Sequence, residues 1–371
     1  MKPARNTTEM DRASHSEKRI YGLSERDRSI LRLVVQSFID TAGPVGSRFL
    51  STNYQLGLSP ASIRNTLSDL ESRGFLDHPY TSAGRVPTER GYRAYVDELM
   101  EQIRLSEEEQ QVLRSQLTES VSDAEQLVRE SSRLLSQFAN LLGVAISPRL
   151  STGVLERLEV VPLSSSRAMF VISVRGGLIR TIILHVESEL SRTALDRVVA
   201  LLNERLSGLT LDEIRRTCRE RVQDLQSDGT GVVQLLMDSS SMLFSEPPAD
   251  RKVEVGGTDR MLAQPEFQQP EELRDLIKLV DDEAAVIGLL DTSDDEAIGS
   301  ARVRIGSENA KPDAEAPARY SVVTAPYQRH NMRGTIGVIG PTRMDYARVI
   351  SLVEGMAALL SWSPDDEFPL G

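Results

Sequence analysis

Hydrophobic residues in the first 75 positions recur at the spacing of amphipathic helices in three successive segments. The first segment begins at Ser24, which makes a capping-box-like start with Asp27, and the turn-forming sequence 41–44 ends it. A second, shorter helix begins near Ser47, and a third begins at Ser59, where a serine cap is followed by a proline suited to the first helical position. The apolar positions are Ile30, Leu31, Val34, Val35, Phe38 and Ile39, then Phe49, Leu50 and Tyr54, then Ile63, Leu67 and Leu70.

The face of the third helix opposite its apolar stripe carries small or polar side chains. These are Ala61, Asn65, Ser68 and Ser72, flanked by Ser62 and Arg64. Such a face can approach base edges closely, because Arg suits guanine and Asn suits adenine. The alternative is an ordinary solvent-exposed helix face, and the sequence of this helix alone does not decide between the two.

A hairpin is predicted directly after the third helix. Phe75 and Leu76 open one strand, 85–87 forms the other, and the loop 79–84 between them contains no acidic residue. The order helix, helix, helix, strand, wing, strand is typical of a winged helix-turn-helix, whose third helix enters the major groove. Base contacts specify the site and phosphate contacts position the protein. The predicted DNA-binding residues are Ser47, Arg48, Ser59, Ser62, Arg64, Asn65, Ser68, Ser82, Gly84 and Arg85.

A long helical pattern follows the hairpin. Thr88 can cap one helix, and Ser106 with Glu109 forms a capping box for another. Apolar positions between 117 and 142 alternate at spacings of four and three, with the polar Ser131 among them. This seam predicts either a coiled coil between two copies of the chain or one long helix packed on its own domain.

The remaining pattern predicts an α+β body. Strands are expected at 154–161, 168–174, 178–185, 286–290, 302–305, 320–325 and 335–339, and helices at 190–225, 231–244, 273–280 and 346–360. Because a mostly helical stretch separates the two groups of strands, we expect a sheet domain that carries an insertion at roughly 188–281.

Charge is distributed unevenly along the chain. The net charge is −12, but residues 1–95 contain 14 Lys/Arg against 10 Asp/Glu, or +4, and the remainder contains 29 against 45, or −16. This split favours nucleic-acid binding by the amino-terminal domain. A charge of +4 implies few phosphate contacts per subunit, so we expect a dimer.

Composition leads us to expect a cytoplasmic protein. No apolar run reaches the roughly 18 residues of a membrane helix, and the first nineteen residues lack the apolar centre of a secretory signal. The single cysteine, Cys218, excludes an internal disulfide and fits a reducing cytoplasm.

Signals for catalysis or metal binding are weak. The histidines, at 15, 78, 185 and 330, have no cysteine or carboxylate at ligand spacing. The acidic runs 281–283 and 294–296 lack the spacing of a calcium loop, and 334–341 lacks either nucleotide fingerprint. Tyr327, Arg329 and Arg333 could contact a ligand if a cavity lies beside them. We predict no catalytic, metal or cofactor site.

Several long motifs resemble one known family. Residues 43–50 (GPVGSRFL), 58–71 (LSPASIRNTLSDLE) and 81–96 (TSAGRVPTERGYRAYV) are similar to the amino-terminal domain of HrcA, the heat-inducible transcription repressor of bacteria. Residues 157–177 resemble the start of that family's GAF-like domain, and 333–350 resemble its carboxy-terminal signature. The resemblance covers nearly the whole chain after about residue 20.

The resemblance implies a winged helix-turn-helix followed by a GAF-like mixed α/β domain with an inserted dimerising domain. We therefore expect a disordered extension (1–20), a winged-helix domain (21–104), a linker helix with the first part of the GAF-like domain (105–187), the insertion (188–281), the second part of the GAF-like domain (282–362) and a tail (363–371).

The resemblance also implies a function. A homodimer would bind the inverted-repeat CIRCE operator of chaperone operons, and the GroE chaperonin would keep this repressor folded. When heat fills the chaperonin with unfolded proteins, the repressor would be lost and transcription would rise. The alternative is a winged-helix regulator whose GAF-like domain senses a small metabolite. An enzyme with a DNA-binding appendage would need a convergent catalytic site, which this sequence does not offer.

Overall fold

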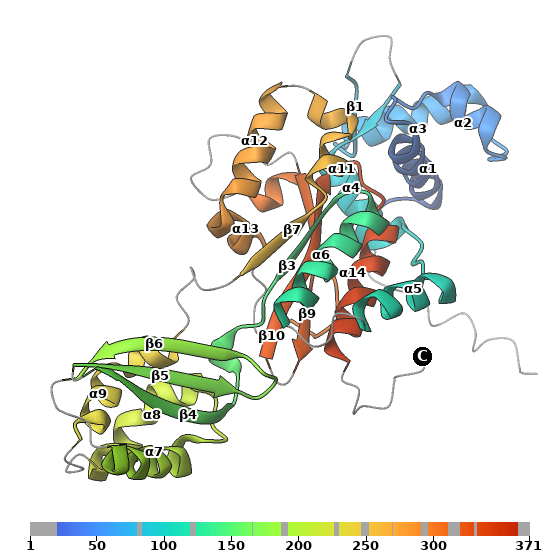
Figure 1. The fold of residues 1–371 in the computed structure, drawn as a ribbon. Coiled ribbons are helices and arrows are strands. Elements are labelled where there is room, and N and C mark those ends of the chain that lie inside the picture. Colours follow the sequence, from blue (N-terminus) through green and yellow to red (C-terminus); the bar gives the residue numbers. More distant parts are fainter. Residues whose placement is uncertain are drawn as a thin grey trace, which may run out of the picture. The chain divides into compact units, whose positions relative to one another are not determined.

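The computed structural model describes residues 21–79, 84–118, 124–164, 166–186, 192–225, 230–245, 252–268, 270–290, 296–310, 320–329 and 332–362 (Figure 1). The chain divides into two compact units. The first contains Met1–Ile103, Ile305–Ser321 and Pro341–Arg348, and the second contains Arg104–Arg304, Val322–Gly340 and Val349–Gly371. The predicted disordered extension and the acidic tail at 363–371 lie outside the described residues.

The amino-terminal part of the first unit has the predicted element order. It contains α1 (Glu25–Thr41), α2 (Ser47–Asn53), α3 (Pro60–Ser72), β1 (Leu76–Asp77), β2 (Val86–Pro87), α4 (Glu89–Ala94) and a π-helical turn (Tyr95–Leu99). The capping box of α1 is confirmed, because Ser24 Oγ accepts from the Asp27 N–H and the Asp27 carboxylate accepts from the Ser24 N–H. β1 and β2 pair antiparallel, with Leu76 opposite Pro87.

The apolar stripes of these helices form one core. Ile30 and Leu31 of α1, Leu50 of α2 and Ile63 and Leu70 of α3 are all fully buried. Burying large aliphatic side chains in this way contributes roughly 1.5–3 kcal/mol each relative to exposing them. The stripe that the sequence assigns to the inside of α3 is therefore confirmed, and it fixes which face of α3 remains outside.

A five-stranded antiparallel sheet organises the second unit, in the order β7-β3-β10-β9-β8. Its strands are β3 (Leu142–Ile146), β7 (Val253–Gly256), β8 (Arg302–Arg304), β9 (Tyr320–Arg329) and β10 (Met332–Pro341). Its helices are α5 (Glu107–Thr118), α6 (Ala124–Ala139), α11 (Thr258–Leu262), α12 (Pro270–Asp281), α13 (Glu283–Leu290) and α14 (Tyr346–Ser361).

Helix α6 lies directly against β3. A Cβ on Gly143 would come within 2.1 Å of the Ser132 carbonyl oxygen, so only glycine permits this approach. The serines on this face, Ser131, Ser132 and Ser136, are buried. The seam predicted over 117–142 is thus divided between α5, α6 and the start of β3, and the burial of α6 favours packing on its own domain over a coiled coil.

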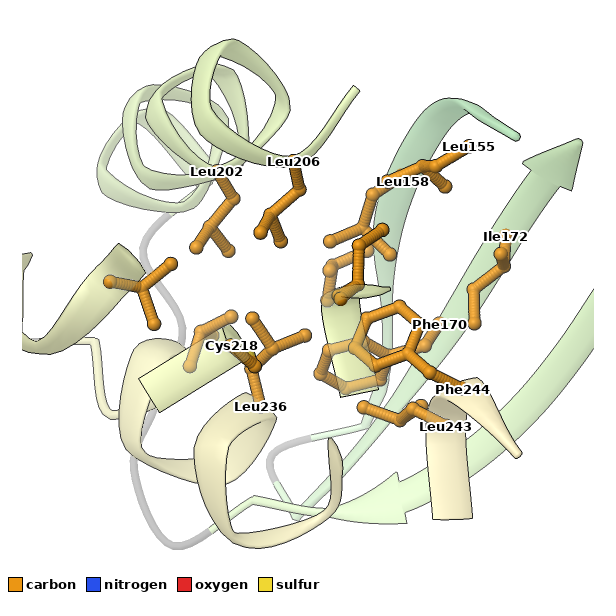
Figure 2. Close-up of a cluster of buried hydrophobic side chains, with 14 of the residues drawn as sticks. Leu155, Leu158, Phe170, Ile172, Leu202, Leu206, Cys218, Leu236, Leu243 and Phe244 are labelled. Atoms are coloured by element: carbon orange, nitrogen blue, oxygen red, sulfur yellow. The ribbon is translucent and has the colours of Figure 1, made fainter. Parts of the chain in front are cut away.

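The chain between β3 and β7 forms a separate layer of strands and helices. It contains β4 (Leu155–Ser164), β5 (Arg167–Val174), β6 (Ile179–His185), α7 (Arg192–Leu206), α8 (Leu211–Val222), α9 (Val232–Asp238) and α10 (Ser240–Phe244). Figure 2 shows Phe170 and Leu158 of the sheet facing Leu202 and Cys218 of the helices. The family resemblance assigned these three strands to the first part of the GAF-like domain, but they form their own sheet, in the order β4-β5-β6, on these helices.

Two further sequence predictions differ from the structure. The strand predicted at 286–290 is wrong: these residues belong to α13, which Asp282 caps by accepting from the Ala285 N–H at 3.0 Å. A short, wholly apolar run does not distinguish a strand from a buried helix. The helices predicted at 190–225 and 231–244 are each divided in two, at Gly208 with its positive φ and at Ser239.

Candidate nucleic-acid interface

Helix α3 presents a polar face away from its core. Ser59 Oγ accepts from the Ser62 N–H at 3.2 Å, so the serine cap predicted at the start of α3 is confirmed. The buried residues Ile63, Thr66, Leu67 and Leu70 define the inner side. The exposed residues are Pro60, Ala61, Arg64, Asn65, Ser68, Asp69 and Ser72. At 100° per residue Asp69 lies at the edge of that face, whereas Asn65 and Ser68 lie near its centre.

Arg26, which the sequence pattern did not single out, lies at the amino end of α3. Its guanidinium donates to the Ser62 carbonyl oxygen at 2.6 Å and to the Ser62 hydroxyl at 3.0 Å. Ser62 is therefore half-buried and already has a partner inside the protein. The two residues are 36 positions apart, and no local pattern signals their contact.

Two of the predicted site residues, Ser47 and Arg48, are neighbours on α2 but differ in exposure. Ser47 is buried within the fold, so its side chain does not face an open surface as predicted. Arg48, the next residue, is exposed, and so is Phe49. Within the described part of the chain, no hydrogen bond or ion pair engages the Arg48 or Arg64 guanidinium. Both guanidinium groups therefore lie on exposed residues, one on α2 and one on α3.

The hairpin is anchored to the turn before α2. Val45 and Arg85 exchange two backbone hydrogen bonds of 2.9 Å, which adds a short third strand to β1 and β2. A Cβ on Gly84 would lie 2.4 Å from the Val45 carbonyl carbon. Gly84 is thus required by the close approach of two backbones, and this role differs from the DNA contact predicted for it.

Arg85 is held by an acid at the end of α3. Its guanidinium pairs with the Glu71 carboxylate at 2.6 Å, and His78 Nδ1 lies 3.8 Å from the same carboxylate. At the base of the hairpin, the Arg85 guanidinium is therefore part of an ion pair and is not an isolated cation. The predicted wing residue Ser82 lies outside the described residues.

Two of the three body residues considered for a ligand contact, Tyr327 and Arg333, have hydrogen-bond partners in the fold. Tyr327 is buried and donates to the Ile146 carbonyl oxygen at 3.0 Å, and burial raises the pKa of its hydroxyl. Arg333 donates to the Glu296 carbonyl oxygen at 2.5 Å. Arg329 is half-buried, and this burial lowers the pKa of its guanidinium. Among the described residues, no His, Cys, Asp or Glu side chains gather as a metal-ligand group. None of the helices described is both long and apolar enough to span a membrane.

Comparison with known proteins gives consistent matches along the chain. Residues 125–350 match the family model described as HrcA protein C terminal domain. The heat-inducible transcription repressor HrcA of Chlorobium limicola is 41% identical over 349 residues, covering 91% of this chain and 97% of that protein. The same-named protein of Chlorobium phaeobacteroides (strain BS1) is 40% identical over 354 residues, covering 92% and 99%.

One solved structure shares the fold. A crystal structure described as that of a hypothetical protein aligns with a TM-score of 0.53 and 22% identity, covering 91% of this chain and 98% of that chain. The similarity to the Chlorobium proteins extends over nine-tenths of the chain. The chain therefore belongs to the HrcA family of heat-inducible transcription repressors.

Proposed function

We propose that this protein represses heat-inducible genes by binding double-stranded DNA through a winged helix-turn-helix formed by α1–α3, β1 and β2. The observation that carries the proposal is the exposed face of α3, on which Arg64 and Asn65 project beside the small residues Ala61 and Ser68. A helix with such a face fits the major groove, where Arg and Asn can each make two hydrogen bonds to a purine. The positive charge of residues 1–95 supports this assignment.

We divide the interface into reading and positioning contacts. Arg64, Asn65 and Ser68 read base edges from the middle of α3. Arg48 on α2 and the backbone N–H of Ala61 in the first turn of α3 contact phosphates, because a helix amino terminus favours anions. Arg26 holds the first turn of α3 in place through Ser62.

The proposed recognition face is tested by electrophoretic mobility shift on an inverted-repeat operator. Arg64→Ala and Asn65→Ala should each weaken specific binding by about 1–3 kcal/mol while the oligomeric state stays unchanged. Arg192→Ala is the matched control, because Arg192 is also exposed but lies on α7. Wild-type affinity in both α3 variants would refute the assignment of α3 as the recognition helix.

We propose that the protein acts as a homodimer paired through the outer face of the β4-β5-β6 sheet. In the cross-strand register Val161, Met169 and Ile183 lie side by side on the face away from the helices. Ile183 is 53% exposed and Ile179 66% exposed. An apolar row of this kind on a sheet is typical of a protein–protein contact. Sedimentation of Ile183→Asp should give monomers, and Val112→Asp, which alters an exposed apolar residue of α5, should leave the dimer intact.

The finer regulation is proposed from the family resemblance alone. The operator would be the CIRCE inverted repeat, and the GroE chaperonin would maintain the repressor in its folded, binding-competent form. To test this step, the repressor is refolded with and without chaperonin, and its operator binding is then compared by mobility shift. Equal recovery of operator binding in both conditions would remove the chaperonin from the account without affecting DNA binding.

A further inference from the structure

Ser62, in the first turn of α3, is fixed by hydrogen bonds on its backbone and on its side chain. Its N–H donates to Ser59 Oγ at 3.2 Å. Its carbonyl oxygen accepts from Arg26 Nη2 at 2.6 Å and from the Thr66 hydroxyl at 3.3 Å. Its hydroxyl oxygen accepts from the same Arg26 nitrogen at 3.0 Å. The position of the Ser62 hydroxyl is therefore set by the fold of the amino-terminal domain itself.

The hydrogen of the Ser62 hydroxyl has no acceptor within the described part of the chain. A serine hydroxyl has one hydrogen to donate and two lone pairs that accept. Arg26 occupies one of these lone pairs. Its positive charge disfavours a second donor at the other lone pair, because the hydrogen of that donor is also positive. The Ser62 hydroxyl is thus prepared to donate to an acceptor on a ligand, and it is poorly suited to accept.

Arg26 has donor groups that its contact with Ser62 does not use. Both hydrogen bonds to Ser62 come from Nη2, so the N–H groups of Nη1 and Nε have no partner among the described residues. Arg26 is exposed, and no described carboxylate forms an ion pair with it. The adjacent acid, Asp27, instead accepts from the Ser24 N–H and lies 3.4 Å from Arg73. Arg26 therefore keeps an uncompensated charge beside α3.

Ser62 lies at the edge of the exposed face of α3. At 100° per residue it is about 60° around the helix from Asn65, and it is half-buried where Asn65 is exposed. In a helix-turn-helix, residues near the amino end of the recognition helix contact base edges. A short side chain at the edge of that face suits the outer rim of a base edge, and Arg26 extends the same edge from α1.

We propose that Arg26 and Ser62 act as one recognition unit, in which the Ser62 hydroxyl donates to a purine N7 and the unused N–H groups of Arg26 bind a phosphate beside that base. The inference rests on the proposed function, since it requires α3 in the major groove. Adenine and guanine both present N7 as an acceptor there, and neither pyrimidine has it. The unit therefore selects a purine over a pyrimidine at one position of each operator half-site.

Arg26 has two effects in this unit, one on sequence preference and one on affinity. It makes Ser62 a donor, because without the guanidinium the hydroxyl would be free to accept from a base amino group as well as to donate. Its phosphate contact adds affinity that does not depend on sequence. A purely structural role would differ from both, because a weakened α3 would bind all sequences less well and would leave the dependence on salt unchanged.

The test uses operators in which single purines are replaced by 7-deaza analogues, which carry a C–H group in place of N7. At one position of the half-site, wild-type protein should lose about fivefold in affinity, the value of one hydrogen bond. In Ser62→Ala and in Arg26→Ala the same replacement should change affinity by less than about twofold, because the two partners are coupled. In Arg64→Ala the loss at this position should persist.

Salt dependence distinguishes the two residues. In Arg26→Ala the slope of log affinity against log salt should become shallower by about 0.9, because one fewer phosphate is neutralised, and in Ser62→Ala it should not change. Arg90→Ala is the matched control. Arg90 is an exposed arginine of the same domain that also donates to a backbone carbonyl, that of Arg73 at 2.9 Å, but it lies on α4. This variant should keep the wild-type response to every 7-deaza replacement.

The outcomes separate this inference from the proposed function. Losses in Ser62→Ala that equal those of the wild type at every purine, or an unchanged salt slope in Arg26→Ala, would overturn the inference and leave α3 as the recognition helix. Failure of the wild type to bind any inverted repeat specifically would overturn both. If Arg26→Ala does not fold, Arg26→Lys replaces it: the retained charge should keep the salt slope, and the loss of the planar fork should still reduce the 7-deaza response.

Discussion

The guanidinium of Arg85 lies 2.6 Å from the carboxylate of Glu71, and this ion pair joins the second strand of the hairpin to the last turn of α3. The pair is shielded, with 17% and 32% of the two side chains exposed. The charge of Arg85 is therefore partly compensated before any DNA approaches. Arg64, on the open face of α3, has no such partner among the described residues.

This difference predicts unequal losses on mutation. Arg85→Ala should weaken operator binding less than Arg64→Ala, which should cost about 1–3 kcal/mol as expected for one bidentate base contact. Fluorescence anisotropy at a fixed salt concentration gives both dissociation constants. A larger loss in Arg85→Ala than in Arg64→Ala would show that the hairpin, and not α3, dominates affinity.

Arg48 should behave as a phosphate contact. In Arg48→Ala we expect uniformly weaker binding to specific and mismatched DNA, because a phosphate contact carries no sequence information. The slope of log affinity against log salt should become shallower by about 0.9 for each phosphate that the protein no longer neutralises. Titrations from low to moderate salt measure this slope. A weakened preference for the operator with an unchanged slope would contradict the assignment.

Gly84 should be intolerant of any side chain. Because a Cβ would meet the Val45 carbonyl carbon at 2.4 Å, Gly84→Ala should break the bridge between Val45 and Arg85 and destabilise the domain by about 1–3 kcal/mol. Urea unfolding followed by circular dichroism measures the change. Gly43→Ala is the control, since its Cβ would have only ordinary contacts beginning at 3.7 Å, and it should stay within about 0.5 kcal/mol of the wild type.

Cys218 should report opening of the core between β4–β6 and α7–α10. Its thiol is buried, and this burial raises its pKa to about 11. A raised thiol pKa lowers the thiolate fraction at pH 8, so alkylation of the folded protein should be far slower than alkylation of the unfolded chain. Mass spectrometry after timed alkylation gives both rates. Rapid labelling under native conditions would mean that this core opens readily.

The amino-terminal domain was the most predictable part from sequence. Ser24 and Ser59 lie next to apolar stripes of helical period, and local capping chemistry determines where α1 and α3 begin. The outward position of Arg64 and Asn65 follows from the same period. The alternation in β5, where Ala168, Phe170 and Ile172 face the core, was equally readable.

Other features depend on partners that no local pattern reveals. The apolar run of α13 suits a strand as well as a helix, so its periodicity predicted a strand where the structure has a helix. Leu142, the first residue of β3, continues the apolar spacing of α6, so the sequence pattern did not predict β3. Ser47 is a polar residue that directly follows a turn, a position that suggests exposure, yet tertiary packing buries it.

The sequence by itself determined the local elements of the proposed DNA-reading head, because caps, turns and hydrophobic period act between residues a few positions apart. Only the tertiary structure decided which charges are compensated and which are open. Arg26 meets Ser62, Arg93 meets Glu308 and Arg343 meets Ile39 across 36, 215 and 304 residues. These pairs form because the packed chain brings their elements together, and this long-range packing leaves Arg48 and Arg64 facing outward.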